Sequence, residues 1–207
     1  MSAPFAIVAL PRSGTAWLSR ALTGDGWTCH HQMAIQMRSA ADVVDLFREP
    51  RTGTAETAIA LGWRLLRRWV PGLRIMVVRR PVDECVASML RVDVGGVARY
   101  DPAILRAGLL REARALDELQ REPDVLTVQF RDLWADESGA AIFRHCLGAP
   151  FNQERWAAFR EINIQADVRT MLHYYQANRV GVDGFKAECK RELFRMAREG
   201  VITRMAA

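Results

Sequence analysis

Lysine is almost missing from this chain of 207 residues, in which Lys186 and Lys190 are the only lysines and arginine supplies the other basic residues. The common nucleotide-triphosphate loop, G-x-x-x-x-G-K-S/T, requires a lysine directly before its last residue. No lysine occurs before Lys186, so the sequence disfavours a kinase or an ATPase of that type.

Paired cysteines and long hydrophobic runs are missing as well. The four cysteines lie far apart, with no C-x-x-C pair, which argues against a zinc site and a disulfide framework, and we expect no metal. The apolar run from Phe5 to Leu10 is too short for a signal peptide or a membrane span. These absences predict a cytoplasmic protein with reduced thiols and no membrane partner.

The composition that remains is that of an ordinary globular protein with a basic surplus. Half of the residues are hydrophobic, 26% are charged, and the net charge is +5. A basic surplus suits an anionic partner such as a nucleotide, although solubility alone would also explain it. Aromatic residues do not interleave with basic ones, and no helix-turn-helix or RNA-binding signature is present, so we expect no nucleic-acid partner.

Apolar runs alternate with segments of helical periodicity along the chain. The runs predict strands at residues 5–10, 27–33, 73–78 and 124–130. Periodic segments predict helices at 16–22, 39–47, 57–70, 82–90, 102–121, 140–147, 153–162 and 185–198. This alternation is typical of an α/β fold with a mainly parallel sheet flanked by helices, and no linker divides the chain, so we predict a single domain over residues 1–207.

The most informative segment joins the first predicted strand to the first predicted helix. It reads Pro-Arg-Ser-Gly-Thr-Ala-Trp-Leu from residue 11 to residue 18. A glycine turn between a strand and a helix exposes successive backbone N–H groups at the helix start, where an anion binds well. Gly14 allows close approach, Ser13 and Thr15 add hydroxyl donors, and Arg12 adds a positive charge. Without further context the segment is equally compatible with a plain capped turn.

This segment resembles the 5′-phosphosulfate loop of sulfotransferases that use the donor PAPS (3′-phosphoadenosine-5′-phosphosulfate), usually P-R/K-S-G-T-T-x-L. The resemblance implies a P-loop NTPase-like sulfotransferase fold in which the 5′-phosphosulfate is held by Arg12, Ser13, Gly14 and Thr15. Ala16 stands where the family usually has a second threonine, so one hydroxyl contact is missing. Trp17 stands where some members place a tryptophan against the adenine.

A second match follows the third predicted strand. The family carries a strand that ends in R-x-P and then a helix with a serine, and the arginine and the serine hold the 3′-phosphate of the donor. Arg79 lies two residues before Pro81, as the pattern requires. The family's spacing places the serine at position 87, where this chain has Ala87, and Ser88 comes one residue later. Either the helix start is shifted or this contact is lost.

A weaker likeness covers residues 124–133 and 142–151, which are similar to a late strand, an acidic turn and a helix end of the family. Together the three matches span about residues 4–151, which we interpret as the donor-binding core. Residues 152–207 would form a helical C-terminal part whose contacts with the donor are not assigned.

Sulfuryl transfer needs charge stabilisation and, for a hydroxyl or amine acceptor, a base. Arg12 would stabilise the negative charge that builds up as the nucleotide leaves. His30 and His31 end the second predicted strand, in the region where some family members carry a catalytic glutamate. Histidine titrates near neutrality, and only one of the pair can face the cleft, so His31 or His30 is a candidate base. Glu56, which we expect at a helix start, is the rival.

The sequence therefore predicts a sulfotransferase with PAPS as co-substrate and PAP as product. The acceptor, which can be a small molecule, a glycan or a peptide, and the oligomeric state are left open. The alternative is a non-catalytic or divergent nucleotide-binding protein of the same fold. A small-molecule kinase is disfavoured by the missing loop lysine.

Overall fold

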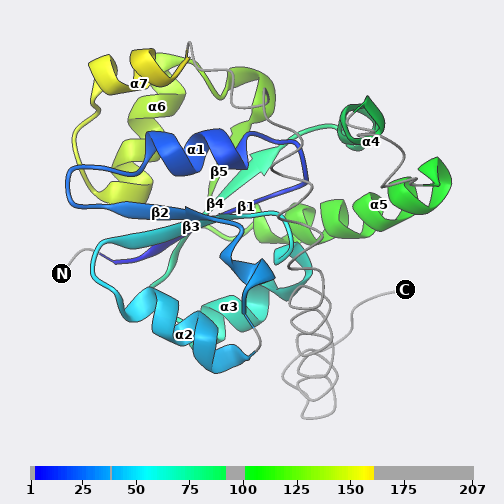
Figure 1. Ribbon diagram of the computed structural model, residues 1–207, viewed down its shortest axis with the longest axis horizontal. Coiled ribbons are helices and arrows are strands. Elements are labelled where there is room, and N and C mark those ends of the chain that lie inside the picture. Colours follow the sequence, from blue (N-terminus) through cyan, green and yellow to red (C-terminus); the bar gives the residue numbers. More distant parts are fainter. Residues whose placement is uncertain (1–2, 38, 92–100, 161–207) are drawn as a thin grey trace.

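A five-stranded parallel sheet forms the centre of the computed structural model, which describes residues 3–37, 39–91 and 101–160 (Figure 1). The strand order is β2-β3-β1-β4-β5, and every neighbouring pair is parallel. The strands are β1 Phe5–Ala9, β2 Thr28–His31, β3 Thr52–Glu56, β4 Arg74–Arg79 and β5 Leu126–Gln129. This confirms the predicted α/β fold with a parallel sheet.

Helices cover both faces of the sheet. The first face carries α1 (Thr15–Ala21), α6 (Asp136–Ile142) and α7 (Gln153–Arg160), as Figure 1 shows. The second face carries α2 (Ala40–Arg48), α3 (Trp63–Trp69) and α5 (Pro102–Leu119), and α4 (Val82–Arg91) packs against α5. Short helical turns are η1 (Met33–Ile35), η2 (Ala60–Gly62), η3 (Phe130–Asp132) and the π-helical η4 (Phe143–Leu147).

The central strand β1 is apolar throughout because both of its faces are buried. Phe5, Ile7 and Ala9 pack in the cluster of hydrophobic residues on the α1 face, whereas Ala6 and Val8 pack in the cluster on the α2 face. All five are fully buried. A strand covered on both sides reads as a continuous hydrophobic run, which is why this one could be recognised in the sequence.

One strand was not predicted. We predicted a helix over residues 57–70 with Glu56 at its start and no strand before it. Residues 52–56 instead form β3, which lies between β2 and β1, and the helix α3 begins only at Trp63. The ring of Phe5 leaves no room for a side chain at Gly53, because an added Cβ would lie 2.2 Å from that ring. Glu56 consequently ends a strand and does not begin a helix, which corrects its expected setting.

The other predicted elements agree with the structure to within a few residues, except near residue 140. There α6 starts earlier, at Asp136, and ends at Ile142, where the π-helical η4 follows it. The helix predicted at 39–47 is α2, which Ser39 caps by accepting from the Asp42 N–H while the Asp42 carboxylate accepts from the Ser39 N–H. The helix predicted at 185–198, and most of the predicted C-terminal part, lie outside the described residues.

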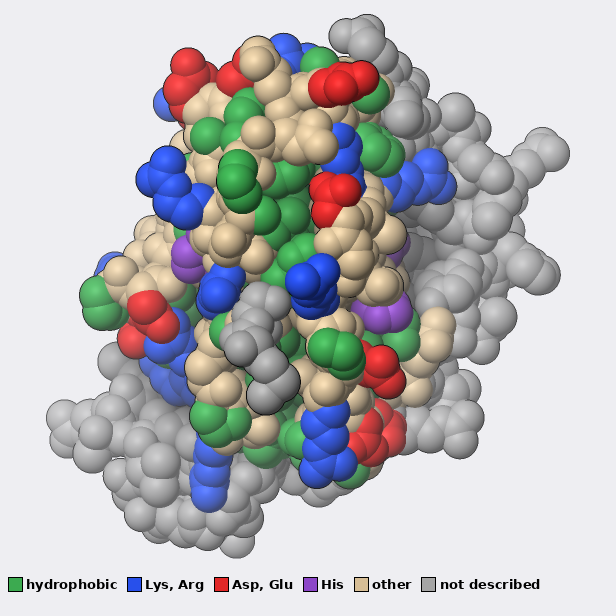
Figure 2. All heavy atoms as spheres, turned by 90° about the vertical axis from the view of Figure 1, so that its left-hand side faces the viewer, with side chains coloured by type: hydrophobic (Ala, Val, Ile, Leu, Met, Phe, Trp, Pro, Cys, Tyr) green, Lys and Arg blue, Asp and Glu red, His purple; other side chains and the backbone are tan. Residues whose placement is uncertain are grey.

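The surface at which the strands begin carries charges of both signs. Figure 2 shows basic and acidic side chains interspersed with hydrophobic ones on this face, so the basic surplus is not gathered there. Within the described part of the chain, no helix is long and apolar enough to cross a membrane, and no group of three metal-ligating side chains occurs.

Candidate functional site

The loop between β1 and α1 has the backbone conformation of an anion site. Arg12 and Gly14 are both left-handed, with φ of 67° and 81°. Alternation of this kind makes the N–H groups of a short loop converge on one point, which forms a concave nest for an anion. The conformation is costly for arginine, and such strain is found preferentially at functional sites. The left-handed backbone at position 14 favours glycine, and an added Cβ would also lie 2.8 Å from a side-chain carbon of Leu133.

The segment from β4 to α4 holds this loop in place. The guanidinium Nε of Arg12 donates to the Ser88 hydroxyl over 3.2 Å, and the Ser13 hydroxyl lies 3.9 Å from the sulfur of Cys85. Ser13, Cys85 and Ser88 are all buried. Ser88 is therefore the α4 residue that contacts the loop, whereas Ala87 is exposed.

Arg79 and Arg80 point in different directions at the end of β4. Arg79 donates to the carboxylate of Asp117 and, over 3.1 Å, to the carbonyl of Ala113, both on α5. Arg80 instead donates to the carbonyl of Arg12 and stacks over the ring of Phe130, with 4.0 Å between its guanidinium carbon and the ring centroid. Arg79 is the last residue of β4 and Arg80 is the first residue after it.

Arg80 and not Arg79 therefore adjoins the loop, although Arg79 was the predicted arginine of the 3′-phosphate. Ser88 follows Arg80 at the interval at which the family's serine follows its arginine, so the displaced serine was the signal that could have revealed Arg80. The R-x-P spacing, by contrast, points to Arg79.

Trp17 is also placed differently from the expected adenine contact. Its side chain is only 5% exposed, and its indole N–H donates to the Phe159 carbonyl over 2.7 Å. The ring packs edge-on against Trp156, with 4.6 Å between the ring centroids, and against Trp134. Trp17 therefore joins α1 to α7 within the core. Its half-buried neighbour Ala16 brings no hydroxyl to the loop.

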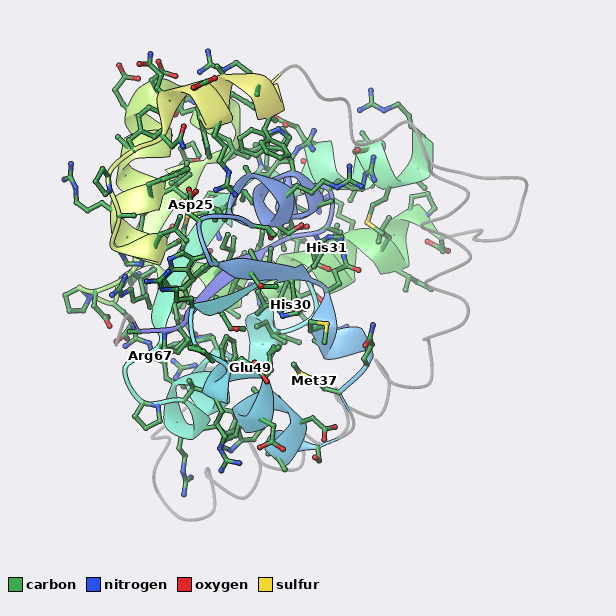
Figure 3. The ribbon with its side chains drawn as sticks, turned by 60° about the vertical axis from the view of Figure 1, so that its left-hand side comes forward. Asp25, His30, His31, Met37, Glu49 and Arg67 are labelled. Carbon is green, nitrogen blue, oxygen red and sulfur yellow. The ribbon has the colours of Figure 1, made fainter. Side chains whose placement is uncertain are left out.

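The two histidines of β2 face opposite sides of the sheet, as Figure 3 shows: His31 lies on the side of α1 and His30 on the side of Met37. The His31 Nε2 atom lies 3.2 Å from the Thr15 hydroxyl at the start of α1. Burial and, to a lesser degree, the charge of Arg20 lower the pKa of His31 to about 4. His31 is thus neutral at pH 7 and can accept a proton.

Glu56 lies on the other face, away from Thr15. Its side chain is 1% exposed and accepts hydrogen bonds from the Thr54 hydroxyl and from the Ala34 N–H. Burial raises the pKa of Glu56 to about 7, although these hydrogen bonds act in the opposite direction. The carboxyl group borders a mainly apolar pocket between β3, α2 and α3, next to Met37.

Replacing Glu56 by glutamine should make stability less sensitive to pH. Because the pKa of Glu56 rises from 4.5 to about 7 on folding, the folded protein binds the proton more tightly, and this contribution to stability is lost as pH rises through that window. As the pH rises from about 4.5 to about 7, the free energy of unfolding of the wild type should therefore fall by about 3 kcal/mol relative to that of Glu56→Gln. Urea unfolding of both proteins at pH 5 and pH 8 measures the difference.

Comparing the two proteins at each pH cancels the opposing contribution of His31, whose pKa falls on folding. An equal difference in unfolding free energy at pH 5 and pH 8 would show that Glu56 does not titrate in this window.

Comparison with solved structures identifies the fold. Mouse sulfotransferase SULT7A1 complexed with PAP superimposes with a TM-score of 0.57 at 18% sequence identity, over 76% of this chain and 63% of that chain. The sulfotransferase domain from the curacin biosynthetic pathway superimposes with a TM-score of 0.54 at 13% identity, over 75% of this chain and 77% of that chain. No family model matches the sequence, and no curated protein matches it.

The chain therefore has the sulfotransferase fold, as the loop motif predicted. It spans less than two thirds of the length of the mouse protein. The likeness establishes the architecture, whereas the chemistry of a protein resides in the residues of its site.

Proposed function

We propose that this protein is a sulfotransferase that moves a sulfuryl group from PAPS to a hydroxyl or amine acceptor. The observation that carries the proposal is the loop after β1, in which the left-handed Arg12 and Gly14 form an anion nest. The Arg12 side chain is also hydrogen-bonded to Ser88. In open parallel sheets, ligands bind at the carboxyl ends of the strands, which is where this loop lies. The PAP complex of the mouse structural neighbour supports the same donor.

The residues around the loop fit a donor with two separate anionic groups. Arg12, Ser13, Gly14 and Thr15 would hold the 5′-phosphosulfate. Ser88 and Arg80 would hold the 3′-phosphate, since both already contact Arg12 and Arg80 brings a second positive charge. Arginine guanidinium groups pair well with phosphate oxygens through several N–H donors. This set of donors involves no metal.

The chemistry asked of the protein is positioning, charge stabilisation and the removal of one proton. The donor supplies the sulfuryl group, and Arg12 would stabilise the charge that develops on the departing phosphate oxygens. His31 would accept the proton of the acceptor, because its imidazole is neutral and adjoins Thr15. An anion held beside Thr15 would raise the pKa of His31 and make it a better base.

One observation favours the alternative of a nucleotide-binding protein without transfer activity. Ala16 replaces the second threonine of the loop and supplies no hydroxyl to the phosphosulfate. Such a protein would bind PAP but release no PAP from PAPS with any acceptor. The cytoplasmic location predicted from the sequence stays a prediction.

Ligand binding tests the proposal directly. PAP should raise the melting temperature of the protein and bind more tightly than either ATP or 5′-AMP, because it alone combines a 5′-phosphate with a 3′-phosphate. Transfer from ³⁵S-labelled PAPS to a panel of phenols, alcohols and amines then tests the activity. Equal stabilisation by all three nucleotides would contradict a donor site of this kind.

The two arginines at the end of β4 form a matched pair for assigning the 3′-phosphate. Arg80→Ala should lower the affinity for PAP by about tenfold or more while leaving 5′-AMP binding nearly unchanged, since a charge-assisted contact is worth about 1.5–3 kcal/mol. Arg79→Ala should mainly destabilise the contact with α5. Calorimetric titration of both variants with both nucleotides measures the effect. A selective loss of PAP affinity in Arg79→Ala would restore the original assignment.

A further inference from the structure

The turn after β2 places a strained residue directly beside His31. Gln32 is buried and left-handed, with φ of 56°, which is an unfavourable conformation for a residue with a side chain. Strain of this kind persists only where the surrounding structure determines the backbone strongly. The contacts that hold Gln32 in this conformation therefore also set the orientation of His31.

Hydrogen bonds join this turn to the end of β3. The Gln32 N–H donates to the Ala55 carbonyl over 3.0 Å, and its side-chain amide donates to the Thr57 hydroxyl over 3.2 Å. The Ala34 N–H donates to both carboxyl oxygens of Glu56 over 3.3 Å. Glu56 and Thr57 are buried, so water competes little for these bonds, and losing one leaves a buried group unpaired.

We propose that Glu56 is a positioning residue, which holds the turn after β2 so that the imidazole of His31 faces Thr15 at the phosphosulfate loop. This inference rests on the proposed function, in which His31 accepts the proton of the acceptor. Glu56 faces the opposite side of the sheet from Thr15 and borders the pocket next to Met37, so it acts through the turn and not on the reacting atoms. Thr57 supports the same turn through Gln32.

The test follows His31 itself in the full-length protein. In Glu56→Ala the Ala34 N–H loses its acceptor and the turn can relax, so the His31 imidazole should leave Thr15 and become more exposed to water. Its pKa, measured by NMR titration with the signal assigned through His31→Gln, should rise from about 4 toward 6.5. Turnover should fall by up to about 10²-fold, as misplacement of a reacting group allows. The affinity for PAP should stay nearly the same.

Glu56→Gln is the conservative control. Its amide oxygen can still accept from Ala34 and Thr54, so it should keep both the low pKa of His31 and the turnover. A Glu56→Gln variant as slow as Glu56→Ala, with the pKa of His31 still low, would mean that the carboxylate itself is the base and would overturn the proposal. So would a folded Glu56→Ala variant with unchanged His31 pKa and turnover.

Thr57→Val covers the case in which Glu56→Ala fails to fold by circular dichroism. It removes only the hydroxyl that accepts from Gln32, and it should move the pKa of His31 in the same direction by a smaller amount. An unchanged pKa would overturn the proposal. The NMR measurement requires no donor, so a wild type that fails to bind PAP would refute the proposed function, while the titration would still decide whether Glu56 holds His31.

Discussion

Replacing Arg12 and Ser13 together by alanine should weaken the binding of PAP by about a hundredfold or more. The change removes one guanidinium and one hydroxyl from the anion nest, and charge-assisted hydrogen bonds are each worth about 1.5–3 kcal/mol. It also removes the hydrogen bond from Arg12 to Ser88, which joins the loop to α4. Isothermal titration calorimetry with PAP measures the loss, and urea unfolding shows whether the variant is still stable.

The same double variant should lose more in catalysis than in binding. Arg12 is expected to stabilise charge that develops only as the nucleotide leaves, and removing one such donor typically lowers turnover by about 10²–10³-fold. Arg48→Ala is a suitable control, because Arg48 is an exposed arginine at the end of α2 whose partner is Asp45. A double variant that binds PAP like wild type would remove the loop from the proposed site.

Replacing His31 by glutamine should lower turnover by about 10²–10⁴-fold and leave PAP affinity nearly unchanged, because loss of a general base costs about this much in rate. Glutamine can keep a hydrogen bond to the Thr15 hydroxyl but cannot accept the acceptor's proton. His30→Ala is the matched control, since His30 lies next to His31 in the sequence and faces the other side of the sheet. Its turnover should resemble that of wild type.

The pH profile separates a base from a residue that only supports the fold. If His31 is the base, kcat/KM should fall on the acid side as the free protein becomes protonated, near its pKa of about 4, and His31→Gln should lack this limb. With donor bound, the limb in kcat should move to higher pH because the anion favours the charged imidazole. Parallel loss of stability and PAP affinity in His31→Gln would instead show a structural role.

Local patterns in the sequence were enough to recognise the loop and the strand before it. The run from Phe5 to Leu10 is apolar because helices cover both faces of the sheet, and the following Arg12 and Gly14 carry the features of an anion site within a few residues. The same reasoning located β4 and β5. In these segments the information is contained in neighbouring residues, so no knowledge of distant contacts is needed.

The strand β3 could not be recognised in this way. Thr52, Gly53 and Thr54 are small or polar and read as a turn, whereas in the fold they pair with β2 and β1. Gly53 is required by the Phe5 ring, which comes from a strand far away in the sequence. A glycine within a strand often marks such a close approach, but the partner is visible only in three dimensions.

The sequence by itself determined the α/β class, the loop around Arg12 that resembles a phosphosulfate loop, and the set of candidate bases. Only the tertiary structure decided which residue of each set adjoins the loop: Arg80 and not Arg79, His31 and not His30, Ser88 and not Ala87. It also buried Trp17 through a contact with Phe159, 142 residues away. The physical reason is that composition specifies which chemical groups are present, whereas the face that each presents depends on strand register and on packing between distant segments.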